Sequence, residues 1–85
     1  MIMDNPQHIS YIQLRIGQTF LESKQVIIDP VKYHVKELNP VEKERIKFGA
    51  LTHCSGYLQA CKDFGILSDC MRDKLLNEYI EMERC

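Results

Sequence analysis

Residues 39–65, NPVEKERIKFGALTHCSGYLQACKDFG, have the pattern of a single long helix. Asn39 and Pro40 are typical of a helix start, because the asparagine side chain caps free backbone amides and proline suits the first helical position. Glu42 is placed for a reciprocal capping contact with Asn39. Gly65 can adopt the left-handed conformation that closes a helix. We therefore predict a helix over almost the whole stretch.

Apolar residues in this stretch follow two rows at helical spacing. Neighbouring residues lie about 100° apart around a helix, so two adjacent rows form one wide apolar arc. An arc of this width predicts a central helix that other helices cover on two sides. The first row is Leu51, Cys54, Leu58 and Cys61, and the second is Ile46, Ala50, His53, Tyr57, Ala60 and Phe64.

The end of the chain predicts an antiparallel partner for the long helix. Ser68 can cap a new helix, Asp69 suits its first turn, and only two residues separate Ser68 from Gly65. Short loops between helices make antiparallel neighbours. The predicted helix at residues 69–84 has one apolar face, which supports this hairpin. That face holds Met71, Leu75, Leu76, Tyr79, Ile80 and Met82.

The first part of the chain allows two interpretations. Asn-Pro at residues 5–6 and Asp-Pro at residues 29–30 resemble helix starts. They predict a helix at residues 6–24 and a short connector helix at residues 30–38, both laid across the hairpin. Alternating apolar residues within residues 11–36 also fit a small β-hairpin. We expect an all-α fold, a small helical bundle with a long central helix and a C-terminal antiparallel helical hairpin. The alternative is an α+β fold with a small N-terminal hairpin.

The length, the net charge and the hydropathy of the chain limit the class of protein. The chain has 85 residues, which corresponds to one domain at residues 1–85. Its formal net charge is −1 and no segment is strongly basic, which argues against a protein devoted to nucleic-acid phosphates. No apolar run approaches the ~20 residues that span a bilayer. The first ten residues lack the basic and apolar regions of a signal peptide, so we expect a cytoplasmic protein with no membrane association.

The four cysteines lack the close spacing of a metal site. Cys54 and Cys61 lie two helical turns apart, about 10 Å, which is too far for a disulfide between them. We expect both as reduced thiols in the core. Cys70, in the first turn of the last predicted helix, is a candidate for a redox or metal-linked site. Cys85 is expected to be mobile at the C-terminus.

No catalytic motif is present. His53 precedes Cys54, but adjacent helical residues point about 100° apart and do not face each other, so a nucleophile and base pair would need His8 or His34 from elsewhere in the chain. No phosphate-binding glycine loop, nucleophile elbow or paired-carboxylate pattern occurs. We therefore expect a non-enzymatic protein without a cofactor or a bound metal.

Gly49, Thr52 and Gly56 form a strip with almost no side chains along one side of the long helix. An internal glycine costs a helix about 1 kcal/mol relative to alanine, so a strip of this kind indicates close approach by another helix. That helix is either the first helix of the same chain or part of another molecule. Aromatic residues are enriched at interfaces, and three are candidate buried anchors of a homodimer. They are Tyr57, Phe64 and Tyr79.

These patterns favour a small protein-binding module, such as an adaptor, an inhibitor or a regulator of the kind encoded by bacteria and phages. One alternative is a nucleic-acid-binding transcriptional regulator that uses a mildly basic region, although glutamates are interleaved there. Another alternative is a thiol-linked or metal-linked sensor that uses Cys70. The residues of the basic region are Lys32, Lys36, Lys43, Arg45 and Lys47.

Overall fold

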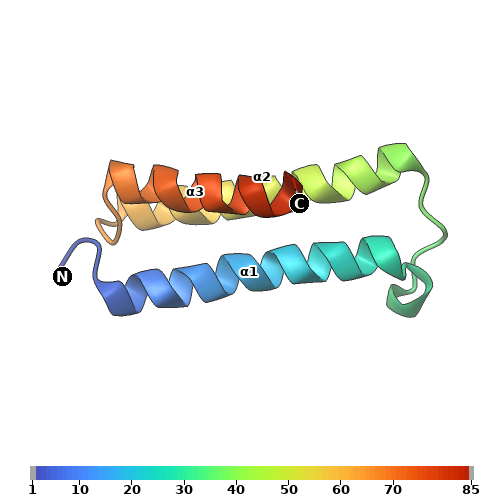
Figure 1. Ribbon diagram of the computed structural model, residues 1–85, viewed down its shortest axis with the longest axis horizontal. Coiled ribbons are helices and arrows are strands. Elements are labelled where there is room, and N and C mark those ends of the chain that lie inside the picture. The colour runs from blue at the N-terminus through green and yellow to red at the C-terminus, as the bar shows by residue number, and fades with distance from the viewer. Residues whose placement is uncertain (1, 85) are drawn as a thin grey trace.

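A computed structural model describes residues 2–84, which form three α-helices (Figure 1). Helix α1 spans Pro6–Ile28, α2 spans Pro40–Asp63 and α3 spans Asp69–Arg84. One turn of 3₁₀ helix, η1, occupies Val31–Tyr33 between α1 and α2. The described residues contain no strand, so the all-α bundle is confirmed and the α+β alternative is wrong. The expectation for Cys85 lies outside the described residues.

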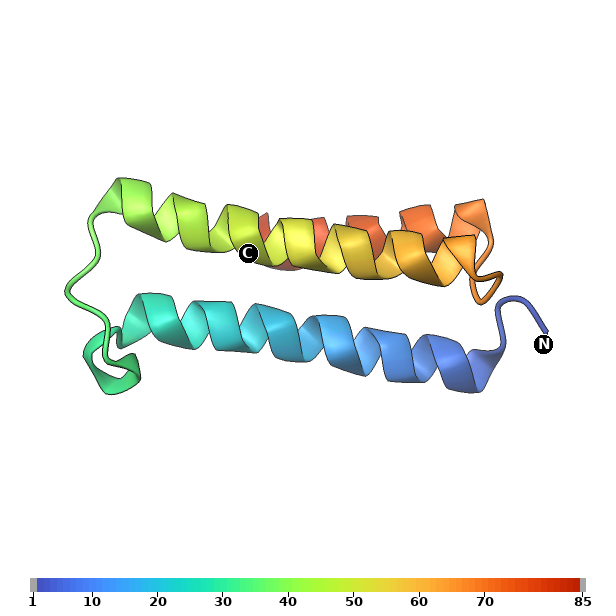
Figure 2. The same ribbon diagram turned by 180° about the vertical axis from the view of Figure 1, so that it is seen from behind.

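The three helices lie lengthwise beside one another in a bundle of 45 × 21 × 19 Å (Figures 1 and 2). α2 contacts both α1 and α3, as its wide apolar arc predicted, and α1 also contacts α3. The prediction that the first helix lies across the hairpin is wrong. Ile12 and Ile16 of α1 enter two successive core clusters along the bundle, with Phe20 against the second, so α1 follows the long axis.

The helix ends carry the predicted caps. The Asn39 Oδ1 atom accepts a hydrogen bond from the Glu42 backbone N–H at 2.8 Å, and its Nδ2 donates to Glu42 Oε1 at 3.0 Å. Gly65 has φ +75°, the left-handed conformation that residues with a Cβ avoid. Ser68 Oγ accepts a hydrogen bond from the Met71 backbone N–H at 3.1 Å. Local chemistry therefore sets where the hairpin begins and turns.

The connection between α1 and α2 differs from the prediction. α1 continues to Ile28, four residues beyond the expected end, and the connector helix is reduced to η1. Pro30 disfavours helical backbone in the residue before it, so α1 stops there. His34 then takes a left-handed conformation, φ 61°, which ends η1. Val31 and Val35 stay exposed, so a longer connector helix would bury no apolar face.

The core is made of two clusters of buried side chains. Tyr79 is the largest residue that is fully buried, and its ring meets the edge of the Phe20 ring with centroids 6.2 Å apart. Cys54 and Cys61 are buried and reduced. Clusters shared by all three helices explain why the bundle is one unit. The first cluster is Ile12, Leu58, Cys61, Leu67 and Leu75, and the second is Ile16, Ala50, Cys54 and Tyr79.

The second predicted apolar row of α2 is only partly buried. Ala50 is buried and Tyr57 is half-buried, but His53, Ala60 and Phe64 are exposed. The two neighbouring helices contact α2 on one broad side, which covers a narrower arc than the sequence suggested. The opposite side of α2 is therefore free.

Candidate functional site

Many apolar side chains lie on the surface of the bundle. Among the described residues, twelve large hydrophobic residues are exposed, against ten hydrophobic residues in the core. Single exposed apolar residues are common and need no explanation, but groups of them indicate contact surfaces. Such groups occur on the outward faces of α2 and α1.

The outer face of α2 holds the predicted glycine strip. Gly49, Thr52 and Gly56 are all exposed. Apart from the two adjacent residues and the helix's own backbone, no atom lies within 4 Å of where a Cβ would stand on Gly49 or Gly56. α1 therefore does not cover the strip, so packing within the chain does not explain these glycines. Phe48, beside Gly49, is 69% exposed and gives the strip an aromatic neighbour.

The three aromatic anchor candidates have different positions. Phe64, the residue after α2, is 80% exposed and free for contact. Tyr57 is half-buried against both core clusters. Tyr79 is fully buried and its hydroxyl donates to Glu83 Oε1 at 2.8 Å. Its place as an interface anchor is therefore wrong, because it faces the centre of the bundle and cannot reach a partner in the folded protein.

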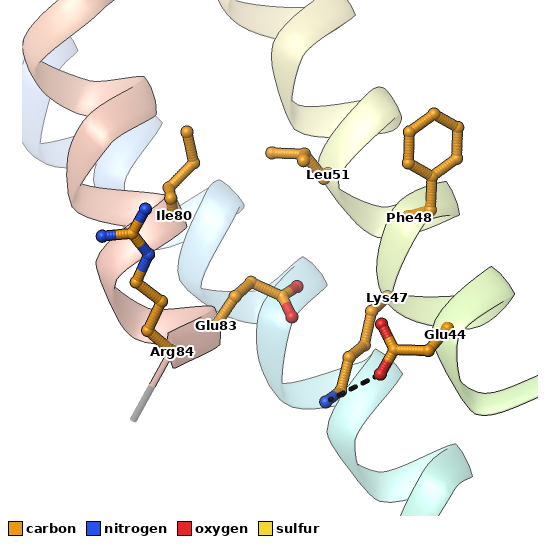
Figure 3. Close-up of a pocket in the computed structure, with 7 residues that line it drawn as sticks. All are labelled: Glu44, Lys47, Phe48, Leu51, Ile80, Glu83 and Arg84. Carbon is orange, nitrogen blue, oxygen red and sulfur yellow. Dashed lines mark ion pairs between the residues drawn. The ribbon is translucent and has the colours of Figure 1, made fainter. Parts of the chain in front are cut away.

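A groove lies between α2 and α3, where α3 ends (Figure 3). Its volume is about 270 Å³. A second pocket of about 200 Å³ on the α1 side shares Lys47 and Glu83 with it. Both exist because α3 has 16 residues and α2 has 24, so α1 and α2 continue past the end of α3. The groove is lined by Glu44, Lys47, Phe48, Leu51, Ile80, Glu83 and Arg84.

Charges of both signs border this groove. Lys47 Nζ lies 3.7 Å from Glu44 Oε1, and Glu83 points from α3 toward α2 (Figure 3). Leu51 and Ile80 supply apolar walls. A mixed border of this kind suits an amphipathic segment of a protein and does not select a phosphate group.

The described residues were compared with the needs of a metal site and of a nucleophilic thiol. No three His, Cys, Asp or Glu side chains between residues 2 and 84 come together in a metal-binding group. His53 and Cys54 line a small pocket of about 20 Å³, and burial raises the pKa of the Cys54 thiol. A raised pKa disfavours the thiolate that nucleophilic chemistry needs. Cys70 is exposed and reduced, and it remains a single thiol on the α3 surface.

The basic residues do not form one surface. Lys32 belongs to η1 and Lys36 to the connection after it. On α2, Lys43, Arg45 and Lys47 follow one another at intervals of two, about 200° around a helix, so Arg45 points away from its two neighbours. This arrangement lacks the common face that binding to nucleic-acid phosphates requires.

Sequence reasoning missed the outward face of α1. Leu14, Leu21 and Ile28 are 58%, 55% and 70% exposed, and they lie at intervals of seven along the helix. The seven-residue spacing was the sequence signal for this apolar face, because residues seven apart fall on one side of a helix. It was obscured because the first predicted helix ended at residue 24, which removed Ile28 from the series.

Comparison of the chain with protein-family models, with curated proteins and with solved structures found no match. Within residues 2–84, none of the helices combines the length and the apolar character that crossing a membrane requires.

Proposed function

We propose that this chain is a small non-enzymatic protein-binding module, an adaptor, inhibitor or regulator that acts by occupying the surface of another protein. The observation that carries the proposal is the open strip on α2 beside Phe48. The glycines of the strip lower the stability of the helix, and no contact within the chain requires them. This is the pattern expected where a helix of a partner approaches closely.

The strip and its neighbour complement each other physically. Gly49 and Gly56 let the backbone of a partner helix approach closely, because they present no side chain. Phe48 offers a ring that is mostly in water, and fully burying a side chain of this size contributes about 1.5–3 kcal/mol. Aromatic residues of this kind are frequent anchors of interfaces. We propose that a helix or an amphipathic segment of the partner lies along this face.

The two alternatives have weaker support. The dispersed basic residues, from Lys32 to Lys47, give a nucleic-acid ligand no common face. A sensor would depend on Cys70 alone. Both alternatives predict different results in the experiment that tests the protein-binding function.

The test is affinity capture from a lysate of the native host, with and without nuclease, using matched variants. Gly56→Arg places a long charged side chain on the strip, where the added Cβ meets nothing within 4 Å. The arginine also restores up to about 1 kcal/mol of helix propensity, so folding is expected to be retained. Asn77→Arg, on the exposed surface of α3, is the control for added charge.

We expect one protein to be captured with and without nuclease, retained by Asn77→Arg and lost with Gly56→Arg. Circular dichroism of each variant checks that the helices are intact. Capture that depends on nucleic acid would support the regulator alternative. Equal capture by Gly56→Arg and the unmodified chain would reject the strip as the binding site.

A further inference from the structure

The outward face of α1 carries no charged side chain over its whole length. The positions within about 60° of Leu14 around the helix, on the side away from the core, are all uncharged. Its centre holds three aliphatic side chains and three amides. They are Leu14, Leu21 and Ile28, and Gln7, Gln18 and Gln25. In a chain with 27% charged residues, an uncharged face that runs the length of a 23-residue helix indicates a covered surface.

Two opposite charges border this face on one side. Arg15 and Glu22 lie about 80–100° from Leu14 around the helix, on the edge nearer α2. They are seven residues apart, about 10 Å along the axis. Both are exposed, and neither belongs to an ion pair among residues 2–84. On the other edge, Lys24 Nζ lies 5.6 Å from the centre of the Phe20 ring.

We propose that this face binds the same face of a second copy, with the two α1 helices antiparallel. A two-fold axis between the helices can place Leu14 opposite Leu21 of the second copy. The same axis brings Arg15 within about 3 Å, along the helix direction, of Glu22 of the second copy. The symmetry forms this pair twice and on one side, so charges that lack a partner in one chain complement each other in two.

The position of η1 determines the antiparallel direction. The Tyr33 hydroxyl donates to Gln25 Oε1 at 2.6 Å, so the turn lies against the end of this face. Figures 1 and 2 show η1 at the end of α1 on the side away from α2. In a parallel pair both turns would occupy the same end and meet. In an antiparallel pair they lie at opposite ends and leave the centre open.

The size of the contact indicates a weak and reversible dimer. Helix α1 is about 35 Å long, and a contact about 10 Å wide buries roughly 700 Å² over the two copies. Stable complexes bury about 1,200–2,000 Å², so we expect a dissociation constant between about 10 µM and 1 mM. The outer face of α2 stays free in this dimer. The inference therefore does not rest on the proposed function.

The first test is sedimentation equilibrium from about 10 µM to about 2 mM, in reducing agent so that thiols cannot cross-link copies. The unmodified chain is expected to show a monomer–dimer equilibrium. Leu21→Lys should weaken association at least tenfold without changing thermal unfolding of the monomer, because the leucine is exposed. Phe64→Lys replaces an even more exposed apolar residue, just after α2 and away from this face, and should dimerise normally.

A charge exchange tests the direction of pairing. Arg15→Glu should weaken association about tenfold, because two attractive pairs become two repulsive ones. The double variant Arg15→Glu/Glu22→Arg should restore association to within about threefold, since it re-forms both pairs. In a parallel pair Glu22→Arg would instead face Lys24, and association would not recover. A monomer at all concentrations, normal dimerisation of Leu21→Lys, or failure of the double variant would overturn the proposal.

Discussion

The carboxylate of Asp4 accepts a hydrogen bond from the backbone N–H of Ser68 at 2.8 Å, although 64 positions separate the two residues. The backbone N–H of Asp4 also donates to the Ile66 carbonyl oxygen at 3.0 Å. Asp4, two residues before the start of α1, therefore completes the hydrogen bonds of the turn between α2 and α3. This contact joins the N-terminus to the hairpin at one end of the bundle.

Replacing Asp4 with alanine should destabilise the fold by about 1–2 kcal/mol, because the Ser68 amide loses its acceptor. Asp4 also has φ 59°, which alanine tolerates poorly. Asp4→Asn keeps a side-chain oxygen and tolerates this conformation, so its unfolding in urea should stay within about 0.5 kcal/mol of the unmodified chain. Equal stability of the two variants would contradict a role for this contact.

Two glycine substitutions should act in opposite directions. Gly65→Ala should destabilise the protein by about 1 kcal/mol, because φ +75° strains any residue with a Cβ. Gly49→Ala should stabilise it by up to about 1 kcal/mol, because the position is helical and open. Thermal unfolding of both variants measures the difference. A stabilising Gly65→Ala would show that the turn can relax.

The buried phenol of Tyr79 should contribute through its hydroxyl as well as its ring. Tyr79→Phe keeps the contact with Phe20 but loses the hydrogen bond to Glu83, which should cost about 1 kcal/mol. Tyr79→Ala also leaves a cavity and should cost about 3–5 kcal/mol. Urea unfolding of the two variants separates the contributions. Equal losses would mean that the ring contributes little.

The free energy of unfolding should fall as the pH rises above about 9. Burial, and then the carboxylate of Glu83, raise the pKa of Tyr79 above the ordinary 10.0, and burial raises the pKa of Cys54 above 9.0. The unfolded chain therefore releases these protons at a lower pH than the folded chain does, which favours unfolding in alkali. Below about pH 9 their contribution is fully present. Urea unfolding at several pH values should show the decline, and Tyr79→Phe should make it shallower above about pH 10.

The thiols should differ in reactivity according to their burial. In a Cys85→Ser background, Cys70 should react at once with a thiol reagent because it is exposed. Cys54 and Cys61 should react only as fast as the bundle opens, since both are buried. The absorbance change of a coloured thiol reagent, followed over time, measures the rate at which the thiols react. Rapid reaction of all three would show that the core is open to solvent.

Much of the fold could be predicted because the helix ends depend on local chemistry. The caps at Asn39, Gly65 and Ser68 act within a few residues, so their sequence patterns were sufficient. The end of α1 was predicted four residues too early, because Pro30 was interpreted only as the start of a connector helix and not as the signal that stops α1. The short connector depended on whether Val31 and Val35 had a surface to bury against. Only the assembled bundle determines that.

The candidate sites also include features that the sequence predicted and features that only the arrangement of the helices determines. The glycine strip was visible as a pattern, but whether α1 covered Gly56 depended on how the helices were arranged. Tyr79 and Phe64 both belong to apolar rows, yet Tyr79 is fully buried in the core and Phe64 is exposed. The contact of Asp4 with Ser68 joins distant segments. Sequence spacing carries no information about such a contact.

The short length of α3 also has a consequence for how the protein opens. At about 1.5 Å per residue, α2 exceeds α3 by about 12 Å. Backbone amides in the first two turns of α2 lack the third helix, whereas those near Leu58 belong to the cluster that all three helices share. Amide hydrogen exchange should therefore form a gradient along α2. Exchange near Val41 would follow frequent local fraying, and exchange near Leu58 would require global unfolding.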